Sequence, residues 1–139
     1  MYKDQKISVV VPAYNEEKLI SKTISSIPDF VDKIIVIDDA SKDKTSEVVN
    51  LEMKSNDRLL LINHEKNQGV GGGIASGYKW SRDNDIDIAV VMGGDAQMNP
   101  EDLPNLLDAI IEKGADFAKG NRLLSSDESN RLQIGRAHV

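Results

Sequence analysis

An apolar run that ends on glycines and a carboxylate is the clearest chemical feature of the chain. In VVMGGDAQMNPEDLP, Val90 to Pro104, the run meets two glycines and then Asp95. A carboxylate in this place can hold a hard cation, and Mg²⁺ is commonly bound by one or two carboxylates together with phosphate oxygens. Glycine lets a ligand approach the backbone closely. The stretch indicates a metal-and-phosphate site, with a simple turn acid before a helix as the alternative.

A second apolar run ends on a pair of acids, Asp38 and Asp39. Acids followed by serine and lysine form stable turns because their side chains accept hydrogen bonds from nearby backbone N–H groups. A carboxylate after the second strand of a nucleotide-binding sheet instead accepts hydrogen bonds from the ligand. We expect one acid to hold a turn and the other to contact a base or ribose, and the sequence leaves open which is which.

Three further side chains suit a nucleotide ligand. Arg122, in KGNRL, has a guanidinium group that can pair with a phosphate through two hydrogen bonds. Tyr14 can stack on a base, and Glu16 follows it by two residues. Each also has an ordinary alternative: a solvated arginine, a tyrosine packed on its own loop, and a favourable charge at a helix start.

Two other patterns are given no ligand-binding role. The run GVGGGIASG, Gly69 to Gly77, has no G-x-G-x-x-G register and no phosphate-binding lysine, and the preceding strand ends too far upstream for a tight turn. Close packing of a helix is the favoured interpretation, and the small residues still leave room for a ligand. His64 and His138 show no ligand spacing, and the sequence supports no Ser–His–Asp arrangement.

Composition narrows the class of protein. The chain has 139 residues and a net charge of −6, which fits one soluble domain and argues against nucleic-acid binding. It has no cysteine, so disulfides and thiolate metal sites are excluded. The first apolar run is interrupted by Pro12 and is too short for a signal peptide or a membrane span. We therefore expect a cytoplasmic chain.

Short apolar runs alternate with amphipathic stretches along the chain. This order predicts an α/β fold of three layers, in which a mostly parallel sheet lies between helices. Ligands of such sheets bind beyond the carboxyl ends of the strands. The polar segments PAYNEE, DDASKDKT, GGDAQMNP and GNRL all follow predicted strands, so we expect them at one edge. The predicted strands span 7–11, 33–37, 58–62, 86–92 and 116–119, and the helices span 16–27, 71–83, part of 41–55, and 99 to about 113.

Taken together, these segments resemble the family 2 inverting glycosyltransferases of GT-A fold, and within them the polyprenyl- and dolichol-phosphate sugar transferases. The resemblance covers residues 5 to 124 or so. It rests on five segments in the right order: ISVVVPAYNEEKLI, IIVIDDASKDKT, NQGVGGGIASGY, VVMGGDAQMNPEDLP and GNRL. In the polyprenyl-phosphate transferases the fourth segment reads DADxQHPPE.

The resemblance implies a role for each matching residue. Those expected to line the nucleotide pocket are Pro12, Tyr14 and Glu16. Asp39 and Asp38 would contact the base or ribose, with Ile37 beside them. In the fourth segment, Gly94 would keep the donor side open, Asp95 would hold Mg²⁺ or Mn²⁺ on the donor diphosphate, and Gln97 would support the loop. Arg122 would contact phosphate.

Two departures from the family pattern qualify this picture. The D-x-D metal motif reads GGD here, so Gly93 replaces its first acid and only Asp95 remains. The family's catalytic domain is also much longer than this chain. We therefore expect residues 1–124 to be the N-terminal, nucleotide-sugar-binding part, and residues 125–139 to be a truncated segment or tail. The catalytic base would lie beyond Val139.

The implied activity is transfer of a sugar, with inversion and metal assistance, from a nucleotide-diphospho-sugar to a polyprenyl phosphate or a glycan. The full-length protein would act at the cytoplasmic face of a membrane through its missing C-terminal part. The alternatives are a non-catalytic nucleotide-binding module with a decayed metal site and a sugar-1-phosphate nucleotidyltransferase, whose glycine-rich signature should follow the first strand. A phosphoacceptor receiver domain is a further alternative, although its acid pair should also follow the first strand.

Overall fold

The computed structural model describes residues 1–94, 101–113, 117–119 and 133–136. Strands and helices alternate along it as far as residue 119, as the sequence predicts, and one more strand follows. They are β1 (Ile7–Ala13), α1 (Ile20–Ser26), β2 (Lys33–Asp38), α2 (Thr45–Met53), β3 (Leu59–Asn63), α3 (Gly69–Asp83), β4 (Ile88–Val91), α4 (Asp102–Lys113), β5 (Phe117–Lys119) and β6 (Gln133–Arg136).

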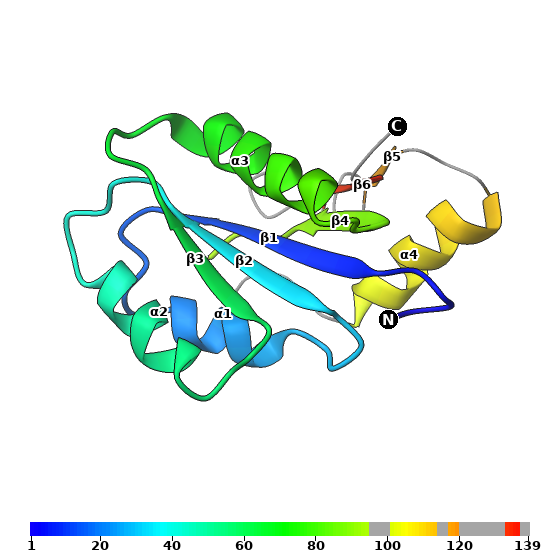
Figure 1. The fold of residues 1–139 in the computed structure, drawn as a ribbon, viewed down its shortest axis with the longest axis horizontal. Coiled ribbons are helices and arrows are strands. Elements are labelled where there is room, and N and C mark those ends of the chain that lie inside the picture. The colour runs from blue at the N-terminus through cyan, green and yellow to red at the C-terminus, as the bar shows by residue number, and fades with distance from the viewer. Residues whose placement is uncertain (95–100, 114–116, 120–132, 137–139) are drawn as a thin grey trace.

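The described strands form one sheet in the order β3-β2-β1-β4-β6-β5 (Figure 1). Strands β1 to β4 pair in parallel, and β6 runs antiparallel between β4 and β5. The central strands are continuous β-branched runs because both of their faces are buried. The mostly parallel α/β sheet is confirmed.

Strand β6 is the main topological feature that the sequence did not indicate. Residues 133–136 lie in a segment with no strong pattern, QIGR, and pair with both β4 and β5. So short a strand, with a glycine inside it, has no periodicity of its own and is defined by its two neighbours. The proposed division of the chain at residue 124 stays a prediction.

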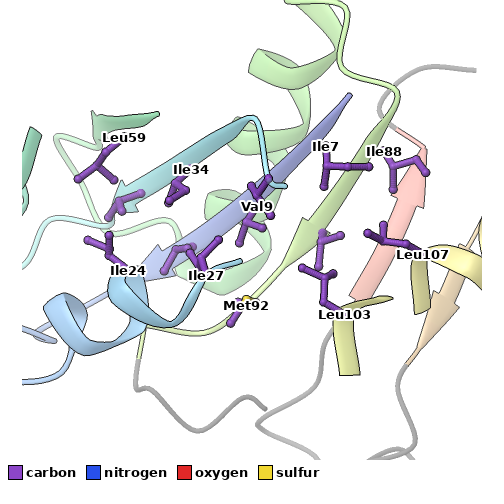
Figure 2. Close-up of a cluster of buried hydrophobic side chains, with 14 of the residues drawn as sticks. Ile7, Val9, Ile24, Ile27, Ile34, Leu59, Ile88, Met92, Leu103 and Leu107 are labelled. Atoms are coloured by element: carbon purple, nitrogen blue, oxygen red, sulfur yellow. The ribbon is translucent and has the colours of Figure 1, made fainter. Parts of the chain in front are cut away.

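The helices lie on both faces of the sheet, which confirms the three layers. On one face, α1, α2 and α4 cover the larger core, part of which is shown in Figure 2. Its helical residues recur at helix spacing, so each helix turns one apolar side to the sheet. They are Ile20 and Ile24 of α1, Val49 of α2, and Leu103, Leu106, Leu107 and Ile110 of α4.

Helix α3 covers the opposite face alone among the described helices (Figure 1). A Cβ atom added to Gly77 would lie 2.2 Å from Cγ1 of Val10, in the centre of β1, so only glycine allows the helix to approach this closely. Gly73 likewise faces Pro12 and Ile37. The interpretation of the glycine run as close helix packing is confirmed for these two residues.

Two helices begin at residues other than those predicted. Helix α1 was expected from Glu16 but starts at Ile20, because Asn15 has a left-handed φ of 55° and the next residues form a turn. Helix α3 starts at Gly69, two residues before the predicted start. The helix start predicted at Asn99 lies outside the described residues. None of the described helices has the length and apolar character needed to cross a bilayer.

Candidate functional site at the carboxyl edge of the sheet

The parallel register brings the ends of three strands to one edge. Ala13 of β1 is in register with Asp38 of β2, which is in register with Asn63 of β3. Backbone hydrogen bonds continue this alignment, since the N–H of Asp39 donates to the carbonyl of Ala13 and the N–H of His64 to that of Asp38, both at 2.9 Å. The loops that follow β1, β2 and β3 therefore start side by side. We call this region the carboxyl edge.

Reciprocal hydrogen bonds join the loops after β1 and β2. The N–H of Asn15 donates to Oγ of Ser41 at 2.9 Å, and Oδ1 of Asn15 accepts from the N–H of Lys42 at 2.9 Å. One residue further, the N–H of Glu16 donates to Oγ1 of Thr45 at 2.9 Å. These hydrogen bonds hold the backbone of the loop that contains Tyr14 and Glu16.

Asp43 anchors the same junction at the start of α2. Its carboxylate accepts from the N–H of Glu17 at 3.2 Å and from the N–H and the hydroxyl of Thr45 at 3.0 and 2.5 Å. Burial alone would raise the pKa of Asp43, but these hydrogen bonds outweigh it and hold the pKa below its ordinary value of 3.8. The acid therefore stays ionised and links two loops, a role the sequence did not indicate.

Asp38 holds the turn after β2. Its buried carboxylate accepts from the N–H of Ser41 at 3.0 Å and from the hydroxyl of Ser46. This is the turn-acid role that the sequence predicts for one member of the acid pair. A contact between Asp38 and a ligand stays a prediction.

Asp39 points to α3. Its carboxylate accepts from the N–H groups of Gln68 and Gly69, at 2.7 and 2.8 Å, and from Nδ1 of His64 at 2.9 Å. Burial by itself would raise the pKa of Asp39, but these donors outweigh burial and lower the pKa below 3.8. Gln68 is the N-cap residue of α3 and Gly69 is its first residue, and N–H groups at a helix start have no partner within the helix, so Asp39 caps α3.

Hydrogen bonds connect Asp39, His64 and Ser76 in that order. The expectation that the chain has no Ser–His–Asp arrangement was therefore wrong. Nδ1 of His64 is bonded to Asp39, and its Nε2 lies 2.8 Å from Oγ of Ser76 on α3. The carboxylate only accepts, so Nδ1 carries the proton and Ser76 donates to Nε2 when the ring is neutral. Ser76 lies mid-helix, where backbone N–H groups are used within the helix, so the arrangement provides no oxyanion hole. It positions Asp39 instead.

The position of His64 was partly readable from the sequence. It directly follows β3, and ligands of parallel sheets bind beyond the carboxyl ends of the strands. His64 therefore meets the criterion that drew attention to the acids at the end of β2. The partner Ser76 carried no such signal, because it lies inside a helix and reaches His64 only through the packing of α3 on the sheet.

Pro12 and Ile37 meet beneath the first turns of α3. A Cβ atom on Gly73 would lie 3.1 Å from Cβ of Pro12 and 3.7 Å from Cγ2 of Ile37. Asp39 binds the same helix one turn earlier. The structure therefore brings three predicted pocket residues together at the start of α3, while Tyr14 extends from the edge with 42% of its surface exposed.

Gly94 lies against the loop after β1. A Cβ atom there would be 3.3 Å from Cβ of Ala13 and 3.5 Å from Cγ of Glu16, so a larger side chain would displace the loop. Gly94 is the last described residue before Asp95, and it lies beside Glu16. The predicted site residues Asp95, Gln97 and Arg122 lie outside the described residues.

A divalent cation at the carboxyl edge stays a prediction, because Asp95, its predicted ligand, lies outside the described residues. Within the described residues, no group of three acidic or histidine side chains is placed to enclose a metal. Hard carboxylate oxygens suit Mg²⁺ or Mn²⁺, and such ions take one or two carboxylates when phosphate supplies further ligands. Asp95 is the residue that would hold the ion.

Residues 8–138 match the family model described as Glycosyl transferase family 2. The chain belongs to this family. Membership confirms the resemblance drawn from the sequence motifs and favours a glycosyltransferase over the nucleotidyltransferase and receiver alternatives.

Individual relatives agree with this assignment. The chain is 31% identical over 144 residues to a UDP-N-acetylglucosamine–dolichyl-phosphate N-acetylglucosaminyltransferase of Methanococcus voltae, a match that covers 94% of the chain and 57% of the relative. The chain therefore spans little more than half of that relative's length.

Two solved structures share the fold. One is a mannosyltransferase of Pyrobaculum calidifontis in complex with GDP-Man and Mn²⁺ (TM-score 0.71, 21% identity, 84% of the chain and 35% of the neighbour). The other is the glucosyl-3-phosphoglycerate synthase of Mycobacterium tuberculosis in complex with Mn²⁺, UDP and glucosyl-3-phosphoglycerate (TM-score 0.66, 26% identity, 82% and 43%).

Proposed function

We propose that the chain is the donor-binding part of a glycosyltransferase that uses a nucleotide-diphospho-sugar. The observation that carries the proposal is the gathering of Asp39, Pro12 and Ile37 at the start of α3, on the same edge from which Gly94 leads to Asp95. One end of this edge offers a carboxylate and apolar surface for a nucleoside. Asp95, which follows Gly94 in the sequence, would supply an acid for the diphosphate.

In the proposed reaction, an acceptor oxygen attacks the anomeric carbon of the donor sugar from the face opposite the diphosphate. The new carbon–oxygen bond forms as the bond to the diphosphate breaks, so the configuration inverts. Asp95 would hold Mg²⁺ or Mn²⁺, which when bound neutralises charge on the leaving diphosphate. Arg122 would donate hydrogen bonds to the same phosphates.

The acceptor we propose is a polyprenyl phosphate. The support is the relative of Methanococcus voltae, whose name specifies a dolichyl phosphate. A phosphate oxygen is already anionic at neutral pH, so its attack needs no general base. A sugar hydroxyl would need one, and the two acids at the end of β2, Asp38 and Asp39, both already accept hydrogen bonds from the protein.

The test of donor binding is a calorimetric titration of the chain with UDP and with GDP in the presence of Mn²⁺. We expect saturable binding that Asp95→Ala weakens at least tenfold, because the metal contact to the diphosphate is lost. The matched control is Asp57→Ala, which removes the same charge from an exposed turn. Unchanged affinity in Asp95→Ala would refute the metal assignment, and absence of binding to both nucleotides would refute the donor site.

A transfer assay distinguishes an enzyme from a non-catalytic nucleotide-binding module. The protein is incubated with the nucleotide-sugar, Mn²⁺ and a short polyprenyl phosphate, and the products are analysed by mass spectrometry. A glycosylated lipid phosphate with release of nucleoside diphosphate supports the proposed transfer. Nucleotide binding with no transfer, in a protein extended to the length of its relatives, supports a binding module.

A further inference from the structure

We infer that Asp39 can recognise only one N–H group of a base, and that the donor is therefore a uridine rather than a guanosine diphospho-sugar. This inference rests on the proposed function, because it concerns the nucleoside end of the same site. It depends on how many hydrogen bonds the Asp39 carboxylate already accepts from the protein.

Hydrogen bonds from the protein occupy most of the acceptor positions of the Asp39 carboxylate. An ionised carboxylate offers about four acceptor positions, two on each oxygen. Oδ1 accepts from Nδ1 of His64 at 2.9 Å and from the N–H of Gln68 at 2.7 Å. Oδ2 accepts from the N–H of Gly69 at 2.8 Å. Oδ1 is therefore filled, and a single position remains on Oδ2.

The two bases differ in what they offer to such a group. Uracil has one ring N–H between two carbonyl oxygens, so it needs one acceptor. Guanine presents a ring N–H beside an amino group, and this pair of donors matches a carboxylate whose two oxygens are both free. At Asp39 the second guanine donor would meet the filled Oδ1. A donor left without a partner in a desolvated site costs binding, and a loss of about tenfold or more is typical.

His64 is the positioning residue that keeps Oδ1 filled. Its side chain is 6% exposed and that of Asp39 is 7% exposed, so the pair is shielded from solvent. The hydroxyl of Ser76 at Nε2 fixes the ring from the other side. The amide of Asn67 also donates to the backbone carbonyl of Asp39 at 3.2 Å, which holds the main chain in place. The carboxylate thus cannot turn to offer both oxygens to a ligand.

The experiment compares UDP and GDP affinities by calorimetry with Mn²⁺, for the wild type and two variants. We expect the wild type to bind UDP at least about tenfold more tightly than GDP. His64→Leu removes the donor to Oδ1, so the UDP/GDP affinity ratio should fall toward one. His64→Asn keeps an N–H group near the position of Nδ1 and should retain the wild-type ratio. Thermal melts establish that each variant is folded.

Three outcomes would contradict the uridine preference or the proposed function. Equal or tighter binding of GDP by the wild type overturns the inference, and this measurement needs no variant to fold. An unchanged ratio in folded His64→Leu also overturns it, because a merely structural histidine would lower both affinities alike. Failure of the wild type to bind either nucleotide refutes the proposed function itself, which distinguishes the two failures.

Discussion

Asp39 satisfies three donors that only an ionised carboxylate can satisfy together. It joins the end of β2 to the start of α3 and to His64. A side chain with the same shape but one fewer acceptor oxygen would lose at least one of these hydrogen bonds. The residue therefore contributes to the fold as well as to the proposed nucleotide site.

Asp39→Asn tests this dual role. One oxygen becomes an amino group that cannot accept, so at least one of the three hydrogen bonds to residue 39 is lost. We expect the free energy of unfolding to fall by about 1–3 kcal/mol, measured by urea denaturation. The control is Asp57→Asn, at an exposed turn. An equal loss in the two variants would show that charge, and not the hydrogen-bond network, is responsible.

At the residue scale, the sequence predicted which residues lie at the carboxyl edge better than it predicted the hydrogen bonds that they form. Asp38 and Asp39 were correctly placed at the end of β2, because the position of an acid next to an apolar run is a local property of the sequence. The bonds from His64 to Asp39 and Ser76 span 25 and 12 residues of sequence, and depend on how α3 packs. No local pattern records such a contact, so His64 was missed.

At the scale of elements, α3 carries glycines of two different kinds. At Gly77, a Cβ atom would lie 2.2 and 2.7 Å from the methyl groups of Val10. At Gly71, a Cβ atom would have nothing within 4 Å. The first glycine is required by the packing of the helix on β1, whereas the second only lowers the helix propensity of its turn.

Gly77→Ala and Gly71→Ala form a matched pair of substitutions in one helix. We expect Gly77→Ala to destabilise the protein by about 1–3 kcal/mol or more, because the helix or Val10 must shift in a packed core. Gly71→Ala should stabilise it by up to about 1 kcal/mol, because alanine favours helix more than glycine does. Urea denaturation of both variants checks the signs. Destabilisation of the same size in both would contradict the packing role of Gly77.

The elements themselves were predictable where their sequence pattern is strong. Strands β1 to β4 are β-branched or aliphatic runs, and their parallel pairing follows from the helices between them. Strand β6 is defined by its neighbours, so its short segment gave no signal. The start of α1 was misplaced because the N–H groups of Glu16 and Glu17 donate to Thr45 and Asp43, which holds these two glutamates in a turn. Propensity alone favours a helix there.

At the scale of the whole molecule, one set of contacts connects the sheet edge to overall stability. Asp39 and Asp43 both accept several hydrogen bonds, and the pKa of each lies below 3.8 in the folded chain. A third acid, Asp108 of α4, binds Lys3 and Tyr2 near the N-terminus, and its pKa is also lowered. The ionised forms of these acids are therefore favoured by folding.

Acid should consequently unfold the chain through these groups. A pKa that is lower in the folded state adds stability above the unfolded value, near 3.8, and this stability is lost as the pH falls through the lower folded pKa. We expect the urea midpoint to change little between pH 7 and pH 5 and to drop steeply below pH 4, measured at constant ionic strength. Asp43→Asn should start lower at pH 7 and show a smaller drop, because one of the responsible carboxylates is gone. A midpoint that is constant down to pH 3, or an undiminished drop in Asp43→Asn, would contradict this account.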